Sequence, residues 1–407
     1  MSRKLLWCRA VLPVVAILLA GCRPDFAGPD PDPDPDPNPA TDTLPVLGHG
    51  LIESRYTAEV AARGDWAYTS TWGNRGAFGN AVFVWDVAGA VPVLVDSLIV
   101  LHAGTTGDVQ ISDDGELLVV ATEGTLGSIV IYDRATPARP AHIATFSSSN
   151  TAGGVHTVKL GTVAGRHYAF LSINPFTAPA RLVIVDITDP AAPVEVLMRE
   201  MGRPFVHDVF VRDGILFTAL WHDGVTIWDI GGAGEGGTPA DPVEIASFSP
   251  ASGNIHNLWW FHDPDAQEQR YLFLGEEGPG SVGSRTSSGD IHVLDISNLD
   301  QPEQVAIYSL PGAGTHNFWM DEASGILYAA YYNGGVRAID VRGDLGACSF
   351  AQRALQGHCN LRLMGREVGV SLLGGTFIWG VVHQGTHVYA SDMLSGLYKI
   401  DASSLVR

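Results

Sequence analysis

The sequence predicts an all-β fold, and three observations support this prediction. The first is a short run of β-branched residues ending in aspartate, which recurs seven times along the chain. The second is a set of further strand-like runs around each copy. The third is that no long stretch of helical periodicity follows the N-terminal segment. Many short strands separated by Gly, Pro and Asp turns are typical of sandwiches, barrels and propellers.

The recurring phrase sets the number of structural units. One copy, Leu182–Asp186, reads LVIVD and is followed by a proline-bearing turn and another strand-like run. The seven copies end at Asp86, Asp133, Asp186, Asp229, Asp295, Asp340 and Asp401. A repeat of about fifty residues is typical of a propeller blade, because one small sheet cannot bury both faces and must stack on its neighbours.

Each unit divides further into four strands. In the fourth unit the strand-like runs are 205–211, 214–221, 224–230 and 242–248. The last unit reaches the C-terminus without an outer strand, whereas residues 44–52 resemble an outer strand that has no unit of its own. The sequence therefore predicts a seven-bladed β-propeller of four-stranded antiparallel blades over residues 44–407. The N-terminal strand is expected to close it, which would remove two open sheet edges.

With seven copies in register, residues 44–407 resemble the LVIVD-repeat β-propeller family, named for the phrase at Leu182–Asp186. The third strands VWDV and TIWDI also resemble those of WD-repeat propellers. The resemblance implies a scaffold and no particular reaction, since one fold serves many functions.

The N-terminus predicts export. Three basic residues accompany an apolar run at residues 11–20, which is too short to span a membrane and suits a secretory signal. The run ends in LLAGC, which resembles the lipobox of bacterial lipoproteins. We expect a signal peptide over residues 1–21 and a lipid on Cys22, and an ordinary cleaved signal is the alternative. The predicted protein is a monomeric lipoprotein of the bacterial cell envelope, anchored in the outer membrane or at the cell surface.

Residues 22–43 alternate proline with aspartate and predict an extended spacer between lipid and propeller. Weak Ca²⁺ binding by these aspartates is the alternative. The whole chain carries 24 Lys+Arg against 44 Asp+Glu, a formal net charge of −20. This balance argues against nucleic acid as a partner and disfavours anionic membrane surfaces.

Cys348 and Cys359 lie in an insertion after the sixth phrase. In an exported protein, two cysteines this close around a loop predict a disulfide. The neighbouring His358 leaves a metal site as the alternative reading.

Four consecutive units place a histidine at the start of the innermost strand, where a propeller opens into its central channel. These residues are His156, His207, His256 and His316. One interpretation is that the imidazoles converge and bind a transition metal, with polar neighbours as outer partners. The other is that each histidine bonds within or between blades for structural reasons. The expected polar residues at the channel mouth are Glu59, Asp108, Asp208, Asn257 and Asn317.

The loops between second and third strands add candidate binding residues, namely Trp221, His222, Glu276 and Glu277. Aromatic and acidic side chains over a channel suit a protein, peptide or carbohydrate ligand. The sequence contains neither a phosphate-binding loop nor a Gly-x-Ser-x-Gly elbow. We therefore expect a non-catalytic binding or scaffold platform with no required cofactor. A metal-dependent oxidoreductase or hydrolase centred on the four histidines is the alternative.

Overall fold

A computed structural model describes residues 42–73, 79–124, 126–175, 179–202, 205–251 and 253–407. Residues 40–407 form one compact unit. The expected signal peptide, Cys22 and the spacer up to residue 41 lie outside the described residues. Within the described part of the chain, no helix is long and apolar enough to cross a membrane.

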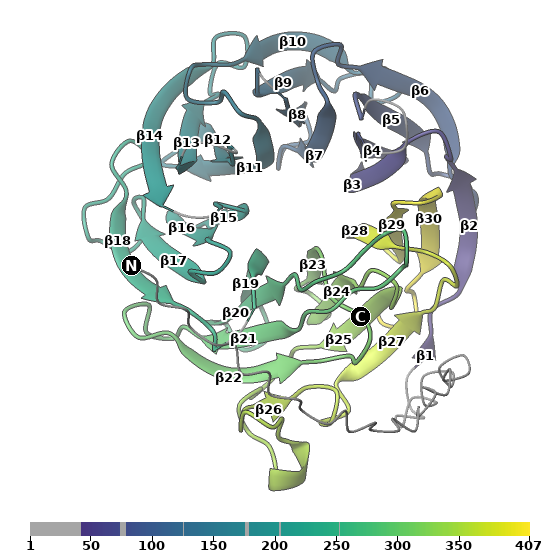
Figure 1. Cartoon of the computed structure of the whole chain (residues 1–407), viewed down its shortest axis with the longest axis vertical. Helices are drawn as coiled ribbons and strands as arrows, with labels where there is room; N and C mark the ends of the chain where they lie inside the picture. The colour runs from purple at the N-terminus through teal and green to yellow at the C-terminus, as the bar shows by residue number, and fades with distance from the viewer. Residues whose placement is uncertain (1–41, 74–78, 125, 176–178, 203–204, 252) are drawn as a thin grey trace, which may run out of the picture. The chain divides into compact units, whose positions relative to one another are not determined.

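The fold is all-β and consists of curled antiparallel sheets placed around a common centre (Figure 1). In all but the last sheet, the main strands are close in sequence. The first contains β3 (Tyr56–Arg63), β4 (Trp66–Trp72), β5 (Ala81–Asp86) and β6 (Val93–Ile99). The second contains β7 (Thr105–Ile111), β8 (Leu117–Glu123), β9 (Ser128–Asp133) and β10 (Ala141–Phe146). The third contains β11 (Val155–Val163), β12 (Arg166–Ile173), β13 (Ala180–Asp186) and β14 (Val194–Gly202).

The later sheets repeat this order. The fourth contains β15 (Asp208–Arg212), β16 (Ile215–Ala219), β17 (Val225–Asp229) and β18 (Val243–Phe248). The fifth contains β19 (Ile255–Asp263), β20 (Glu268–Glu276), β21 (Ile291–Asp295) and β22 (Glu303–Tyr308). The sixth contains β23 (Phe318–Asp321), β24 (Ile326–Ala330), β25 (Val336–Asp340) and β27 (Glu367–Ser371). Two short strands, β1 (Asp42–Thr43) and β26 (Cys359–Asn360), run parallel to β27 and β22 respectively.

The last sheet combines both ends of the described chain. It contains β28 (Ile378–Gln384), β29 (His387–Asp392), β30 (Gly396–Asp401) and β2 (Val46–Leu51). β2 is antiparallel to β30, with Gly48 opposite Lys399 and Leu51 opposite Gly396. The expected pairing of the N-terminal strand with the final unit is therefore present.

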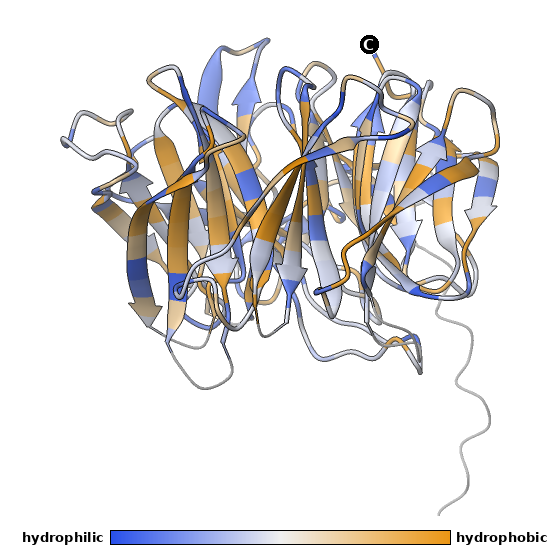
Figure 2. Cartoon of the chain, turned by 90° about the horizontal axis from the view of Figure 1, so that it is seen from above, coloured by the Kyte–Doolittle hydropathy of each residue, from blue (hydrophilic) through white to orange (hydrophobic). Residues whose placement is uncertain are grey.

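Apolar residues of neighbouring sheets pack against one another. One cluster joins Phe217 and Ile227 of the fourth sheet to Leu272 of the fifth. Another joins Trp85 of the first sheet to Tyr389 of the last. Figure 2 shows hydrophobic residues concentrated along the strands, whereas many of the connecting loops are hydrophilic. Sheet-to-sheet packing of this kind explains why one unit could not fold alone.

The aspartate that ends each third strand has one local role. Each side chain accepts a hydrogen bond from the backbone N–H two residues later, for example Thr188 N to Asp186 Oδ1 at 2.9 Å. The same contact forms at Asp86, Asp133, Asp229, Asp295, Asp340 and Asp401. Such an Asx turn ends the strand and starts the connection to the outer strand. This turn explains why the repeated phrase ends in aspartate.

Asp229 is the most elaborate of these turns. Its fully buried carboxylate accepts backbone hydrogen bonds from Gly231, Gly232, Ala233 and Glu235 at 2.8–2.9 Å. Gly237 N donates a fifth at 3.1 Å. These donors favour the ionised form and, although burial opposes them, hold the pKa of Asp229 down at about 2.

Cys348 and Cys359 form a disulfide with Cα atoms 5.8 Å apart, which confirms the predicted bond. The bridge closes a loop that contains the 3₁₀ turn η1 (Phe350–Gln352). In Figure 1 the segment carrying β26 projects outward beyond β22.

Candidate functional site

Backbone irregularities at the start of the inner strands direct side chains toward the centre. The β11–β12 register shifts between Val155 and Thr157, and the β19–β20 register between Ile255 and Asn257. His156 and His256 are therefore the extra residues of two bulges. A bulge lets a side chain leave the regular alternation of the strand and be aimed at a site.

A central cavity of about 330 Å³ lies where these strands begin. Every histidine expected at the channel lines it, as do the five expected polar residues and one expected loop residue. They are His156, His207, His256, His316, Glu59, Asp108, Asp208, Asn257, Asn317 and Glu277. The lining also includes Lys159, Phe210, Trp259 and Trp319, each three positions further along its strand than the channel-mouth histidine.

His156 and His207 are hydrogen-bonded to each other through their ring nitrogens. Their Nε2 atoms lie 3.0 Å apart, and the Nδ1 of His156 lies 3.0 Å from Glu123 Oε1. Two nitrogens bound to one tetrahedral zinc ion at ~2.0–2.1 Å would lie roughly 3.3 Å apart. The pair thus has nearly the spacing of two ligands of one metal. Glu123 is hydrogen-bonded to the other ring nitrogen of His156, as carboxylates next to metal-bound histidines often are.

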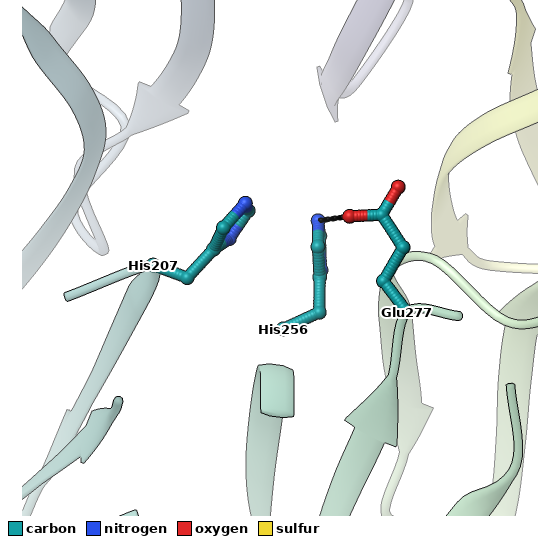
Figure 3. A group of neighbouring side chains, drawn as sticks. All are labelled: His207, His256 and Glu277. Atoms are coloured by element: carbon teal, nitrogen blue, oxygen red, sulfur yellow. Dashed lines mark ion pairs between the residues drawn. The ribbon is translucent and has the colours of Figure 1, made fainter. Parts of the chain in front are cut away.

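His256 and Glu277 extend the cluster (Figure 3). The His256 and His207 rings are 4.0 Å apart between centroids, and His256 Nε2 lies 3.8 Å from Glu277 Oε2. One ligand atom from each of His207, His256 and Glu277 lies within 4.8 Å of the others. Tyr332 donates its hydroxyl to Glu277 Oε1 at 2.6 Å and so fixes the carboxylate. Nitrogen and oxygen ligands without thiolate suit a divalent transition metal.

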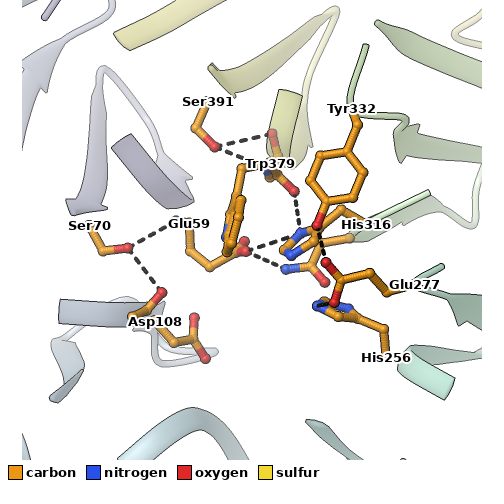
Figure 4. A network of polar contacts seen from close by, with 12 residues as sticks. Glu59, Ser70, Asp108, His256, Glu277, His316, Tyr332, Trp379 and Ser391 are labelled. Atoms are coloured by element: carbon orange, nitrogen blue, oxygen red, sulfur yellow. Dashed lines mark hydrogen bonds and ion pairs between the residues drawn. The ribbon is translucent and has the colours of Figure 1, made fainter. Parts of the chain in front are cut away.

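His316 behaves differently from the other three histidines. Its Nδ1 donates to the backbone oxygen of Trp379 in the last sheet at 2.7 Å, and its ring lies 4.1 Å from that indole. Glu59 lies 3.8 Å from the same nitrogen and accepts a hydrogen bond from Asn317 (Figure 4). His316 therefore fits the structural interpretation, a bond between neighbouring sheets.

Burial sets the protonation of the cluster. Loss of water, and then repulsion from neighbouring histidines, lowers the pKa of His207, His256 and His316 well below the usual value, so these rings are neutral. Burial also acts to lower the pKa of His156, but the Glu123 carboxylate more than offsets this and raises it. Neutral imidazoles offer lone pairs, which metal binding requires.

The carboxyl groups of Glu59, Asp108 and Asp208 and the amine of Lys159 also line the cavity. Burial, together with charge repulsion from Asp108, raises the pKa of Asp208 to about 7. Burial also raises the pKa of Glu59 and Asp108. Lys159 lies 5.0 Å from the ring of Phe210, and burial lowers its pKa despite the neighbouring carboxylates.

Two aromatic residues frame the cluster from strained positions. Trp221 and Tyr332 occupy the same place in their units and have φ values of 57° and 42°. Trp221 stacks on His207 with centroids 4.8 Å apart, and Tyr332 lies 5.0 Å from His316. Left-handed backbone at a bulky residue is costly and is found mainly at functional sites.

Two of the expected loop residues point elsewhere. Glu276 pairs with His292 at 3.1 Å inside the fifth sheet, and His222 is exposed. Sequence reasoning did not find the Glu123–His156 contact or the place of Lys159. One sequence signal could have placed Lys159 in the cavity. Like Phe210, Trp259 and Trp319, it lies three residues after the channel-mouth histidine of its unit.

Comparison with known proteins agrees with the repeat. Residues 178–198 match the LVIVD repeat family model. The match covers β13 and its Asx turn at Asp186. No curated protein matches the chain.

Proposed function

We propose that the chain is a binding protein that holds a divalent transition metal ion at its central cavity. His207 and His256 are the nitrogen ligands, and Glu277 is the oxygen ligand. His156 lies beside them and is hydrogen-bonded to His207. The observation that carries this proposal is that one ligand atom from each of His207, His256 and Glu277 lies within 4.8 Å of the others. The metal would keep an open position toward the cavity for a small ligand, whose size the volume of about 330 Å³ limits.

The ligand set also predicts a moderate affinity. The Nδ1 atoms of His207 and His256 are buried and have no partner among the described residues. Loss of one such partner typically weakens metal binding 10–100-fold. We expect a micromolar rather than nanomolar dissociation constant.

The test is calorimetric titration of the purified chain with Zn²⁺, together with the visible absorption of the Co²⁺ form. We expect one site per chain and loss of binding in the His207→Ala, His256→Ala double variant with its fold retained. His292→Ala is the matched control, because His292 also pairs with a glutamate but lies outside the cavity. Unchanged binding in the double variant would overturn the proposal. An enzymatic function would use the same metal site. If the protein converted a substrate only in the presence of the added metal, that result would replace the binding function with an enzymatic one.

We also propose that the fold is a closed seven-bladed propeller. The pairing of β2 with β30 and the apolar cluster between Trp85 and Tyr389 support closure between the first and last sheets. Lys399 adds a polar link, donating to the backbone oxygens of Val87 at 2.7 Å and Gly89 at 2.9 Å. Deletion of residues 44–52 should expose the edge of β30 and make the protein aggregate. A monomeric, soluble deletion variant would refute closure by this strand.

Finally, we propose that the chain is exported and anchored through a lipid on Cys22. The support is the apolar run followed by LLAGC at the N-terminus. Cys22→Ser should move the protein from the membrane fraction to the soluble fraction. If the parent protein carries no lipid mass, the anchor is wrong.

A further inference from the structure

The disulfide-closed loop at residues 348–359 presents an unusual surface. Phe350 is 91% exposed and Leu355 is 105% exposed, although both side chains are large and apolar. The exposed large apolar residues of β2 and β6, in contrast, are 37–59% exposed. A rigid loop that holds two apolar side chains in solvent is typical of an interaction site.

The charge of this loop differs from that of the molecule. Residues 345–366 contain Arg353, Arg362 and Arg366 but no aspartate or glutamate, whereas the whole chain has a net charge of −20. Arg353 Nη1 donates to the Gly357 backbone oxygen at 2.6 Å, which keeps the guanidinium beside the apolar tip. Apolar side chains flanked by arginine suit the boundary between lipid headgroups and acyl chains.

The start of the described chain lies at the edge of the sixth sheet, whereas the end of this loop lies at the edge of the fifth. β1 is parallel to β27, with Asp42 opposite Gly369 and Thr43 opposite Val370. The end of the loop, β26, is instead parallel to β22, with Cys359 opposite Ala306. The start of the described chain and the end of the loop thus lie on two different sheets of the same compact unit.

From these observations we propose that the tip of the 348–359 loop inserts into a lipid bilayer surface through Phe350 and Leu355. This proposal builds on the Cys22 anchor. Tethering raises the effective concentration of the loop at the membrane surface to the millimolar range, so that a weak contact can form. The disulfide stabilises the loop before it binds, so less conformational entropy is lost on insertion. The contact would hold one edge of the domain against the membrane and leave the central cavity free.

Flotation with phosphatidylcholine vesicles tests the loop separately from the anchor. The protein is the chain from residue 23 onward, which lacks Cys22 and retains the whole compact unit. We expect weak partitioning that falls at least about tenfold in the Phe350→Ser, Leu355→Ser double variant. Val93→Ser with Leu101→Ser is the matched control, because these residues are 55% and 88% exposed and lie in β6 and in the turn that follows it. This control should partition like the parent.

Each other outcome overturns the proposal. Parent protein that does not float, or a double variant that floats equally well, removes the loop as a membrane contact. Loss of binding in the Val93, Leu101 control instead places the contact on the outer strands. If the parent self-associates without lipid and the double variant does not, the loop is an interface between copies of the chain. None of these results bears on Cys22→Ser fractionation, so failure of the loop and failure of the anchor remain distinguishable.

Discussion

Asp208 and Asp229 belong to the same sheet, yet their surroundings have opposite effects. Asp229 accepts five backbone hydrogen bonds at the end of β17, and its pKa falls to about 2. Asp208 begins β15, faces other carboxylates in the cavity, and its pKa rises to about 7. Hydrogen-bond donors surround the structural carboxylate of Asp229 and favour its charged form. The cavity carboxylate of Asp208 has too few donors to offset its burial.

The largest effect on stability should come from replacing Asp229, whose carboxylate accepts the five backbone hydrogen bonds. Asp229→Ala leaves five backbone N–H groups without their acceptor and should lower the free energy of unfolding by about 3 kcal/mol at pH 7. Urea unfolding measures this loss. Asp133→Ala is the matched control, since Asp133 holds the same place in the second sheet with one turn hydrogen bond to Ala135 N at 2.7 Å, and should cost about 1 kcal/mol. Equal losses in the two variants would contradict the special role of Asp229.

The pH dependence of the Asp229 contribution follows from its depressed pKa of about 2. The stabilisation is fully present above the unfolded-state pKa of about 4 and is lost as pH falls toward 2. The difference in unfolding free energy between parent and Asp229→Ala should therefore shrink between about pH 4 and pH 2. A difference that stays constant across this range would show that the carboxylate charge is not the cause.

Asp208 should show the opposite sign and a smaller effect. Because its folded pKa is raised to about 7, the folded state is favoured at low pH, and this advantage is lost as pH rises from about 4 through 7. Asp208→Asn should therefore be more stable than the parent by about 1–2 kcal/mol at pH 8 and equal to it near pH 4. The side chain is only partly buried, which limits the gain. A variant less stable than the parent at pH 8 would reverse the interpretation.

The smallest effect concerns the one lysine of the cavity. Lys159 lowers the pKa of Asp208, although burial and Asp108 outweigh it. Lys159→Met should raise the pKa of Asp208 by up to about one unit. The pH at which the Asp208-dependent stability is lost should move upward, as measured by unfolding at a series of pH values. A downward movement would mean that Lys159 acts through packing on Phe210 and Trp259 instead of through charge.

The sequence predicts the repeated sheets well because their causes are local. Strand runs of four to nine residues and an aspartate that forms its own turn can be recognised without knowing the partner sheet. The pairing of β2 with β30 was predictable because one unit lacked a strand and another segment had no unit. The convergence of the channel-mouth residues was predictable because they share one position in every unit.

The details of the candidate site depend on contacts that no local pattern contains. His156 contacts Glu123 of the second sheet and His207 of the fourth. Whether two neighbouring imidazoles meet through nitrogens or ring faces depends on how adjacent sheets pack and on the bulge at each inner strand. His316 shares its position with His156, yet it bonds to the Trp379 backbone. Equal positions in a repeat therefore do not guarantee equal roles.

The pairing of Val46–Leu51 with Gly396–Asp401 has a consequence for the order in which the protein assembles. The ribosome makes β2 (Val46–Leu51) long before its partner β30 (Gly396–Asp401). Consecutive sheets can pair internally as they emerge, because their strands are close in sequence. The β2–β30 junction must wait until β30 has been made, and among the described strand pairs it carries the largest loop-closure entropy. Any fragment truncated before β30 keeps an unpaired β2, so chains released early during translation should be prone to aggregate and to be degraded.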